Sequence, residues 1–135
     1  MINGTKKRIL ILDDCKIAKR AIQYYLIESG YQVECTDTVE RAVIIYHNDP
    51  RPDLLVLDND LGSGEINGVE VLNILDKKIP IIMHSGNESI RQRAFDYGAI
   101  DFISKNKSIE ALITSIDTIL SHRLFTNKNC KCLTS

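Results

Sequence analysis

Two uninterrupted apolar runs, each closed by acidic residues, constrain the fold of this 135-residue chain more than any other feature of its sequence. Residues 9–12 (Ile-Leu-Ile-Leu) end at Asp13 and Asp14, and residues 54–57 (Leu-Leu-Val-Leu) end at Asp58. A short apolar run without alternation is typical of a strand that is buried on both faces, as in a parallel sheet. Because parallel strands need crossover connections, helices should stand between them.

The rest of the chain continues this alternation. Gly30 stands where a left-handed cap would end the first helix, and Asp37 with Glu40 three residues later predicts a capping box for the second. The pattern predicts an α/β fold, a doubly wound five-stranded parallel sheet flanked by five helices with right-handed crossovers. The remaining predicted strands are 31–35, 81–83 and 101–103, and the predicted helices are 17–26, 37–46, 68–77, 90–97 and 109–120.

The composition fits one ordinary globular domain. The chain is 44% hydrophobic and 26% charged, and its formal net charge of −1 offers no basic field for binding nucleic acid or an anionic membrane. No apolar stretch approaches the roughly 20 residues that span a bilayer, and no signal-peptide pattern is visible. We therefore expect a cytoplasmic protein whose four cysteines are free thiols.

The last residues carry weak signals. Residues 125–135 show no periodicity, so we expect a domain over 1–124 followed by a mobile tail. The four residues from Cys132 onward fit a prenylation box, a match that arises often by chance. Cys130 and Cys132 together are too few ligands for a zinc site.

Polar residues follow four of the predicted strands. Asp13 and Asp14 come after the first, Asp58 after the third, Ser85 after the fourth and Lys105 after the fifth. The carboxyl ends of the strands form the ligand site in doubly wound sheets, so these side chains should meet at one rim. Neighbouring carboxylates repel each other unless a cation intervenes, and Mg²⁺ prefers carboxylate oxygens together with phosphate. Each residue alone also fits a helix cap or a solvated turn, but the set indicates a site for metal and phosphate.

Five separated motifs, in this order, resemble the response-regulator receiver domain of two-component signalling. They are the run ending at Asp13 and Asp14, the run ending at Asp58, and residues 68–72, 80–86 and 97–105. The resemblance covers about residues 6–122. It implies a flavodoxin-like (βα)5 fold with strand order 2-1-3-4-5, here of the stand-alone, single-domain type.

The resemblance also implies a role for each residue at the rim. Asp58 would accept a phosphoryl group from a histidine kinase or a phosphotransfer protein. Asp14, Asp58 and the backbone carbonyl of Asp60 would bind Mg²⁺ or Mn²⁺, and Asp13 would act mainly through a bound water. Lys105 would pair first with Asp58 and then with the phosphoryl oxygens. Phosphoryl transfer depends on such positioning and on cationic stabilisation of the phosphoryl oxygens.

A switch and a binding face follow from the same resemblance. Ser85 would hydrogen-bond to the phosphoryl group and draw its loop inward, and Phe102 would fill the space that the loop vacates. The simpler alternative is that Phe102 is an ordinary core residue. The switched face would comprise residues 88–122 and would bind a downstream protein or a second copy of the chain. No basic recognition helix is visible, so we expect no direct DNA binding.

Several features depart from the family pattern. The 59–67 loop is about two residues longer than usual, and its two glycines indicate flexibility. Asp60 and Asn87 stand where the family tunes the lifetime of the phosphoryl group. Asn106 replaces the proline that often follows the lysine with a cis bond. Since a cis bond before another residue costs about 2.5–4 kcal/mol, a trans or strained linkage is expected.

Two alternative functions share parts of the pattern. Residues 54–61 also resemble the signature of aspartyl-phosphate phosphatases, but those enzymes place their acidic metal pair after the lysine, whereas Asp13 and Asp14 precede Lys105. The second alternative is a degenerate receiver that only binds proteins. A working receiver would not be an enzyme in the usual sense, since it would catalyse only its own phosphorylation and slow dephosphorylation.

Overall fold

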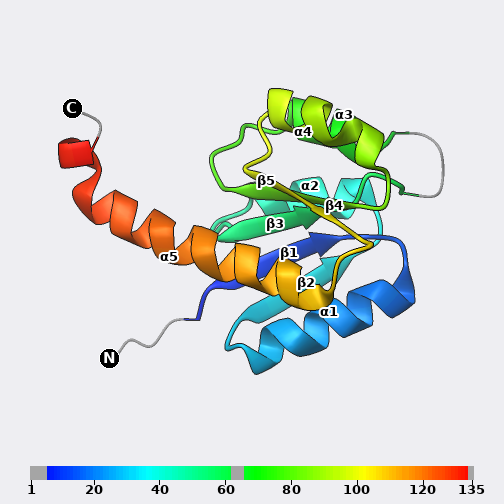
Figure 1. Ribbon diagram of the computed structural model, residues 1–135, viewed down its shortest axis with the longest axis horizontal. Helices are drawn as coiled ribbons and strands as arrows, with labels where there is room; N and C mark the ends of the chain where they lie inside the picture. Colours follow the sequence, from blue (N-terminus) through cyan, green and yellow to red (C-terminus); the bar gives the residue numbers. More distant parts are fainter. Residues whose placement is uncertain (1–5, 62–65, 134–135) are drawn as a thin grey trace.

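One central parallel sheet organises the computed structural model, which describes residues 6–61 and 66–133, with side chains as far as residue 121 (Figure 1). The strands are β1 (Arg8–Leu12), β2 (Gln32–Thr36), β3 (Leu54–Leu57), β4 (Ile81–Ser85) and β5 (Asp101–Ser104). Their order is β2-β1-β3-β4-β5, and every neighbouring pair is parallel. The predicted fold class and strand order are confirmed.

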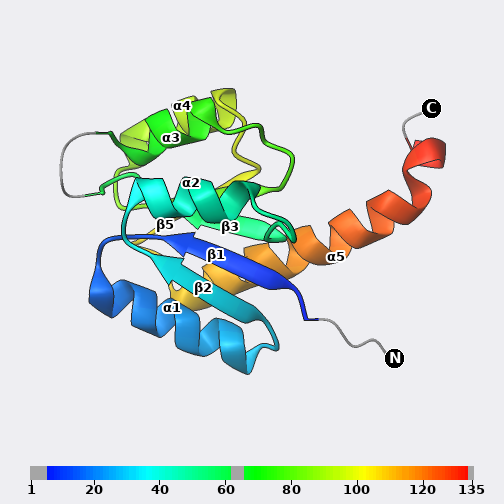
Figure 2. The same ribbon diagram turned by 180° about the vertical axis from the view of Figure 1, so that it is seen from behind.

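Helices cover both faces of this sheet. α1 and α5 lie on one face, and α2, α3 and α4 lie on the other (Figures 1 and 2). This is the doubly wound arrangement that the alternation of patterns predicted. The helices are α1 (Lys16–Glu28), α2 (Val39–His47), α3 (Gly68–Ile74), the short 3₁₀ helix η1 (Glu88–Ile90), α4 (Arg91–Asp96) and α5 (Ile109–Leu133).

The apolar strands are buried on both faces. In β1, Ile9 and Ile11 pack in the core beneath α1 and α5, whereas Leu10 and Leu12 pack in the core beneath α2, α3 and α4. None of these four side chains is more than 1% exposed. Full burial of such a side chain contributes roughly 1.5–3 kcal/mol, so the two cores fix the strand and thereby the point where its polar continuation begins.

The capping signals in the sequence predicted the end of α1 correctly and the start of α2 wrongly. Gly30 follows α1 with a φ of 98°, the left-handed conformation predicted for it. The predicted cap of α2 was wrong, because Thr38 rather than Asp37 is the N-cap and accepts a hydrogen bond from the Arg41 amide. The extended backbone of Thr38 (φ −120°, ψ 141°) delays the helix by one residue, so Glu40 does not stand at the capping-box position.

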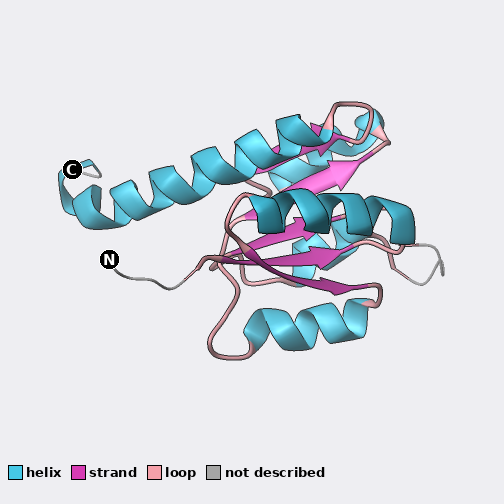
Figure 3. Cartoon of the chain, turned by 90° about the horizontal axis from the view of Figure 1, so that it is seen from below, coloured by secondary structure: helices cyan, strands magenta, loops and turns pink. Residues whose placement is uncertain are grey.

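α5 is longer than the sequence pattern predicted. It continues to Leu133, so most of the segment without apolar periodicity is helical, and it extends away from the sheet (Figure 3). The side chains of Cys130 and Cys132, and the end of the predicted prenylation box, lie outside the described residues. No helix in the described part of the chain has the length and apolar character that crossing a bilayer requires.

Candidate functional site

The polar residues that follow β1, β3 and β5 leave the sheet at one rim. Asp13 directly follows Leu12, and the Asp58 amide donates a hydrogen bond to the carbonyl of Leu12 at 2.9 Å. The Lys105 amide donates in the same way to the carbonyl of Ser85 at 2.9 Å. These bonds continue the strand pairing beyond the strands, so the side chains of Asp13, Asp58 and Lys105 start from neighbouring points of the sheet edge.

Three carboxylates form a cluster at this rim. Asp13, Asp14 and Asp58 each place a carboxylate oxygen within 4.8 Å of the others. Asp13 and Asp58 are buried, at 2% and 4% exposure, whereas Asp14 is exposed. Two of the acids are therefore shielded from water, and the third lies where the cluster opens to solvent. The structure thus brings together the three acidic residues that the sequence singled out.

Lys105 bridges the two buried acids. Its Nζ lies 3.0 Å from Asp13 Oδ2 and 3.0 Å from Asp58 Oδ2. Burial lowers the pKa of Lys105, but the hydrogen bonds and charges of both carboxylates outweigh it and hold this pKa above its ordinary value. The ammonium group therefore stays charged at neutral pH, and it offsets one of the two buried negative charges.

The carboxyl group of Asp58 ionises less readily than an ordinary aspartate. Burial raises its pKa, and repulsion from Asp13 raises it further, to about 6, against the opposing effects of Lys105 and the Asp60 amide. A second cation near the cluster would relieve this repulsion. A perturbed acid of this kind, held at the end of a strand, is typical of a functional site.

The cluster fits a hard divalent cation. Its donors are carboxylate oxygens, its carboxylates outnumber its ammonium group, and Mg²⁺ prefers such ligands. Two of the oxygens are already oriented by main-chain amides. Cys15 donates to Asp13 Oδ1 at 2.9 Å, and Asp60 donates to Asp58 Oδ1 at 3.3 Å. These bonds hold the carboxylates in place before any ion binds.

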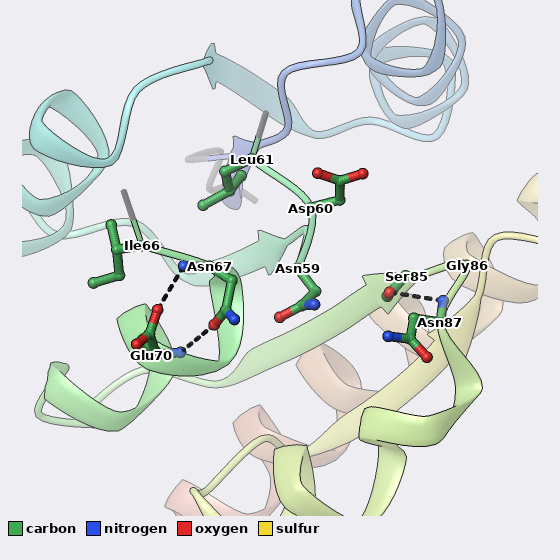
Figure 4. A pocket seen from close by; sticks show the side chains of 9 residues that line it. All are labelled: Asn59, Asp60, Leu61, Ile66, Asn67, Glu70, Ser85, Gly86 and Asn87. Carbon is green, nitrogen blue, oxygen red and sulfur yellow. Dashed lines mark hydrogen bonds between the residues drawn. The ribbon is translucent and has the colours of Figure 1, made fainter. Parts of the chain in front are cut away.

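A polar cavity of about 530 Å³ opens between the loops that follow β3 and β4, next to Asp58 in the chain (Figure 4). Ser85 is buried there, and its Oγ accepts a hydrogen bond from the Asn87 amide at 3.0 Å. Because a hydroxyl group both accepts and donates, Ser85 can also donate a hydrogen bond. The lining residues are Asn59, Asp60, Leu61, Ile66, Asn67, Glu70, Ser85, Gly86 and Asn87.

Phe102 belongs to the core beneath α2, α3 and α4, at 2% exposure. The guanidinium carbon of Arg91 lies 5.1 Å from the centre of its ring, within the range of a cation–π contact. The ring therefore points inward. This position fits both hypotheses, because a switch residue would be inward in one of its states and a core residue would be inward always.

The structure fully describes two of the three departures from the family pattern. Among the described residues the only cis peptide bond is Asp49–Pro50, so the bond between Lys105 and Asn106 is trans. The side chain of Asn87 is engaged in capping η1, since its Oδ1 accepts from the Ser89 amide at 3.0 Å. The glycines of the 59–67 loop fall in 62–65, outside the described residues.

Two residues near the rim were missed by the sequence patterns. His84 is 7% exposed, and its Nδ1 has no hydrogen-bond partner among the described residues. Burial and the charge of Lys105 lower its pKa to about 4. Its place in a buried strand was a signal that the side chain would be enclosed. Asn59 binds the first turn of α3 ten residues away, a contact for which the sequence holds no local signal.

Comparisons with known proteins agree with this geometry. The family model of the response regulator receiver domain matches residues 9–117. The response regulator MprA of Mycobacterium sp. (strain KMS) is 31% identical over 119 residues, which cover 84% of this chain and 50% of MprA. The phosphate regulon transcriptional regulatory protein PhoB of Klebsiella pneumoniae is 29% identical over 121 residues, which cover 84% of this chain and 52% of PhoB.

A solved structure agrees as well. The crystal structure of a CheY-like response regulator receiver domain protein from Methanospirillum hungatei JF-1 has a TM-score of 0.78 at 25% identity, covering 87% of this chain and 96% of that chain. The chain spans about half the length of the curated relatives named above. Asp13, Asp58 and Lys105 all lie within the range that the family model matches. The chain belongs to the response regulator receiver domain family.

Proposed function

We propose that this chain is a phosphorylation-controlled switch in which Asp58 accepts a phosphoryl group from a histidine of a sensor kinase or phosphotransfer protein. One observation carries the proposal. The buried Asp58 carboxylate at the end of β3 clusters with Asp13 and Asp14 and lies 3.0 Å from the ammonium of Lys105. This combination is suited to an oxygen nucleophile that must approach a negatively charged phosphoryl donor.

The reaction exchanges one bond to phosphorus for another. A carboxylate oxygen of Asp58 forms the new O–P bond while the P–N bond to the donor imidazole breaks, and the departing imidazole takes up a proton from water. With a pKa of about 6, Asp58 is mostly ionised at neutral pH and so has the charge that a nucleophile requires. Lys105 keeps its contact with the carboxyl group and can extend it to the phosphoryl oxygens.

A divalent cation would complete the charge balance. Receiver domains generally bind Mg²⁺ at an acidic pocket, and here Asp13, Asp14, Asp58 and the backbone carbonyl of Asp60 would hold Mg²⁺ or Mn²⁺. When bound, the ion would neutralise phosphoryl oxygens as charge develops on them. Asp13 and Asp58 are already oriented by the amides of Cys15 and Asp60.

The switch follows from the position of Ser85. Its hydroxyl group would donate a hydrogen bond to a phosphoryl oxygen, which would draw the loop after β4 toward Asp58. Phe102 already lies inward and would stabilise that state of the 88–122 face. The output of the chain, acting in the cytoplasm, would then be contact with a downstream protein or a second copy of the chain, with no direct DNA binding.

The test is phosphorylation by a small donor. Incubation with acetyl phosphate and Mg²⁺, followed by intact-mass measurement, should add one phosphoryl group to the wild-type chain and none to Asp58→Asn. Asp76→Asn is the control, because Asp76 pairs with Arg51 outside the acidic cluster and should leave the modification intact. An unmodified wild type, or a modified Asp58→Asn, would overturn the proposal. Repeated release of phosphate from many esters would instead identify a phosphatase.

A further inference from the structure

One residue ties the chain next to the phosphoryl site to the start of α3. The carbonyl of Asn59 accepts a hydrogen bond from the Gly68 amide at 2.9 Å, and Asn59 Oδ1 accepts one from the Val69 amide at 3.0 Å. We propose that Asn59 is a positioning residue for the metal site, because it fixes the main chain between Asp58 and Asp60. The inference rests on the function proposed above, in which that main chain contributes to ion binding.

The start of α3 packs directly against the main chain of Asp58 and Asn59, with no room for a side chain between them. A Cβ atom at Gly68 would lie 2.2 Å from the carbonyl oxygen of Asp58 and 2.7 Å from Cα of Asn59. The first turn of α3 therefore touches the main chain of the proposed phosphoacceptor itself. The two hydrogen bonds to Asn59 hold the helix in this contact, so a movement of either partner is transmitted to the other.

Asn59 is also connected to the acidic cluster on its other side. The amide of Asp58 is fixed to the Leu12 carbonyl at 2.9 Å, and the amide of Asp60 donates to Asp58 Oδ1 at 3.3 Å. Asn59 is the residue between these two anchors, so its orientation sets the direction of the Asp60 main chain. Mg²⁺ demands near-ideal octahedral geometry, and losing a residue that orients its ligands typically weakens binding by about 10–100-fold.

The same helix supplies a matched control. Asn67 is the N-cap of α3, its Oδ1 accepts from the Glu70 amide at 3.0 Å, and its own amide donates to Glu70 Oε1 at 2.9 Å. Both asparagines thus cap α3 with a side-chain amide and line the same cavity (Figure 4). Asn59 adjoins Asp58, whereas Asn67 lies eight residues further along the loop, so Asn67 caps the helix without holding the cluster.

The experiment compares Asn59→Leu, Asn67→Leu and Asn59→Asp in the full unphosphorylated chain. The dissociation constant for Mg²⁺ is measured by isothermal titration calorimetry, and the urea midpoint by circular dichroism. We expect Asn59→Leu to weaken Mg²⁺ binding about tenfold and Asn67→Leu to change it less than twofold, with similar losses of urea midpoint. Asn59→Asp keeps the acceptor oxygen and should bind Mg²⁺ at least as tightly as the wild type.

Equal effects of the two leucine variants on Mg²⁺ binding would overturn the proposal and leave Asn59 as an ordinary cap. A wild-type chain that binds no Mg²⁺ would instead count against the proposed function. If Asn59→Leu does not fold, amide hydrogen exchange of the wild type decides. Because coupling is reciprocal, Mg²⁺ should slow exchange at Gly68 and Val69 more than at Glu70, and equal slowing at all three would refute the role.

Discussion

Acid–base pairs stand at both ends of the sheet. Near the amino ends of the strands, two nitrogens of Arg51 lie 3.2 and 3.0 Å from the two oxygens of Asp76, and the pair is partly exposed. At the carboxyl ends, Lys105 shares one ammonium between the buried Asp13 and Asp58. The hydrogen bond from Arg51 holds the pKa of Asp76 well below its ordinary value, whereas burial and Asp13 raise the pKa of Asp58 to about 6.

The pKa of Asp76 is lowered and that of Asp58 is raised, so the charge of Asp76 is well balanced in the folded chain and that of Asp58 is not. Asp76 has a bidentate cation of its own, so its charge is stable in the folded chain without further help. Asp58 shares its cation and is buried, so it ionises less readily than an ordinary aspartate, and a further positive group would stabilise its charge. The pair at the amino ends is therefore balanced without a ligand, whereas the cluster at the carboxyl ends could hold a metal ion.

The largest expected difference between the two ends of the sheet is the loss of stability when the basic side chain, Lys105 or Arg51, is removed. Lys105→Met should lower the free energy of unfolding by about 3 kcal/mol in Mg²⁺-free buffer at neutral pH, because two buried carboxylates lose their partner. Arg51→Met should lower it much less, since water can reach that pair. Urea unfolding followed by circular dichroism measures both, and comparable losses would contradict the distinction.

Replacing Asp58 and Asp76 by asparagine should change the free energy of unfolding in opposite directions. Asp58 has a pKa of about 6 in the folded chain against an ordinary value of 3.8, so the folded state binds its proton more readily and gains stability as pH falls from 6 to 4. At pH 7.5, Asp58→Asn should therefore be more stable than the wild type by about 2 kcal/mol, and the gain should shrink toward pH 4. Asp76→Asn should be destabilising at pH 7.5, and a stabilised Asp76→Asn would break the comparison.

His84 should oppose Asp58 in the same pH window. Burial and the nearby Lys105 lower its pKa to about 4 from 6.5, so the unfolded chain binds this proton more readily and stability falls as pH drops from 6.5 to 4. In the wild type we expect the two effects to oppose each other and largely cancel. His84→Leu should expose the rise due to Asp58, of about 2 kcal/mol, and Asp58→Asn should expose the fall due to His84. Urea midpoints measured every half pH unit would show this, and parallel profiles would rule it out.

Main-chain packing at the rim should tolerate no added atom. Gly68→Ala must move the Asp58 carbonyl, which lies 2.2 Å from the new Cβ position, and we expect a loss of about 2 kcal/mol together with slower phosphorylation by acetyl phosphate. Gly86→Ala is the control, because its Cβ would meet no atom within 4 Å. Similar stability and phosphorylation rates for the two variants would show that the loop after β3 yields easily.

Sequence patterns predicted the sheet and its polar rim because both follow from local facts. A short apolar run without alternation is typical of a strand buried on two faces, and the first polar residue after it lies at the sheet edge, as Asp13 and Asp58 do. Contacts between distant residues gave no such signal. The bond from Val69 to Asn59 and the missing partner of His84 depend on how loops and layers meet in space. The sequence could not decide between Asp37 and Thr38 as the cap of α2, because both residue types are favoured at an N-cap and the two are adjacent.

The smallest predicted difference concerns two arginine–aromatic contacts, Arg51 over Tyr46 at 4.8 Å and Arg91 over Phe102 at 5.1 Å. Arg51 is also fixed by hydrogen bonds, whereas Arg91 forms a long ion pair with Glu88, at 3.9 Å. Arg91→Ala should therefore cost only about 0.5 kcal/mol of stability.

The same substitution should nevertheless let the Phe102 ring leave the core more often, because the guanidinium group covers one of its faces. Phenylalanine-labelled NMR spectra, with Phe102 assigned through Phe102→Leu, should show its ring signals broaden and move toward solvent-exposed values. Arg51→Ala should leave these signals in place, since it acts on Tyr46 at the other end of the sheet. An unchanged Phe102 signal in Arg91→Ala would show that the core alone holds the ring inward, and the carboxyl-end contact would then be no more a part of the switch than its counterpart at Tyr46.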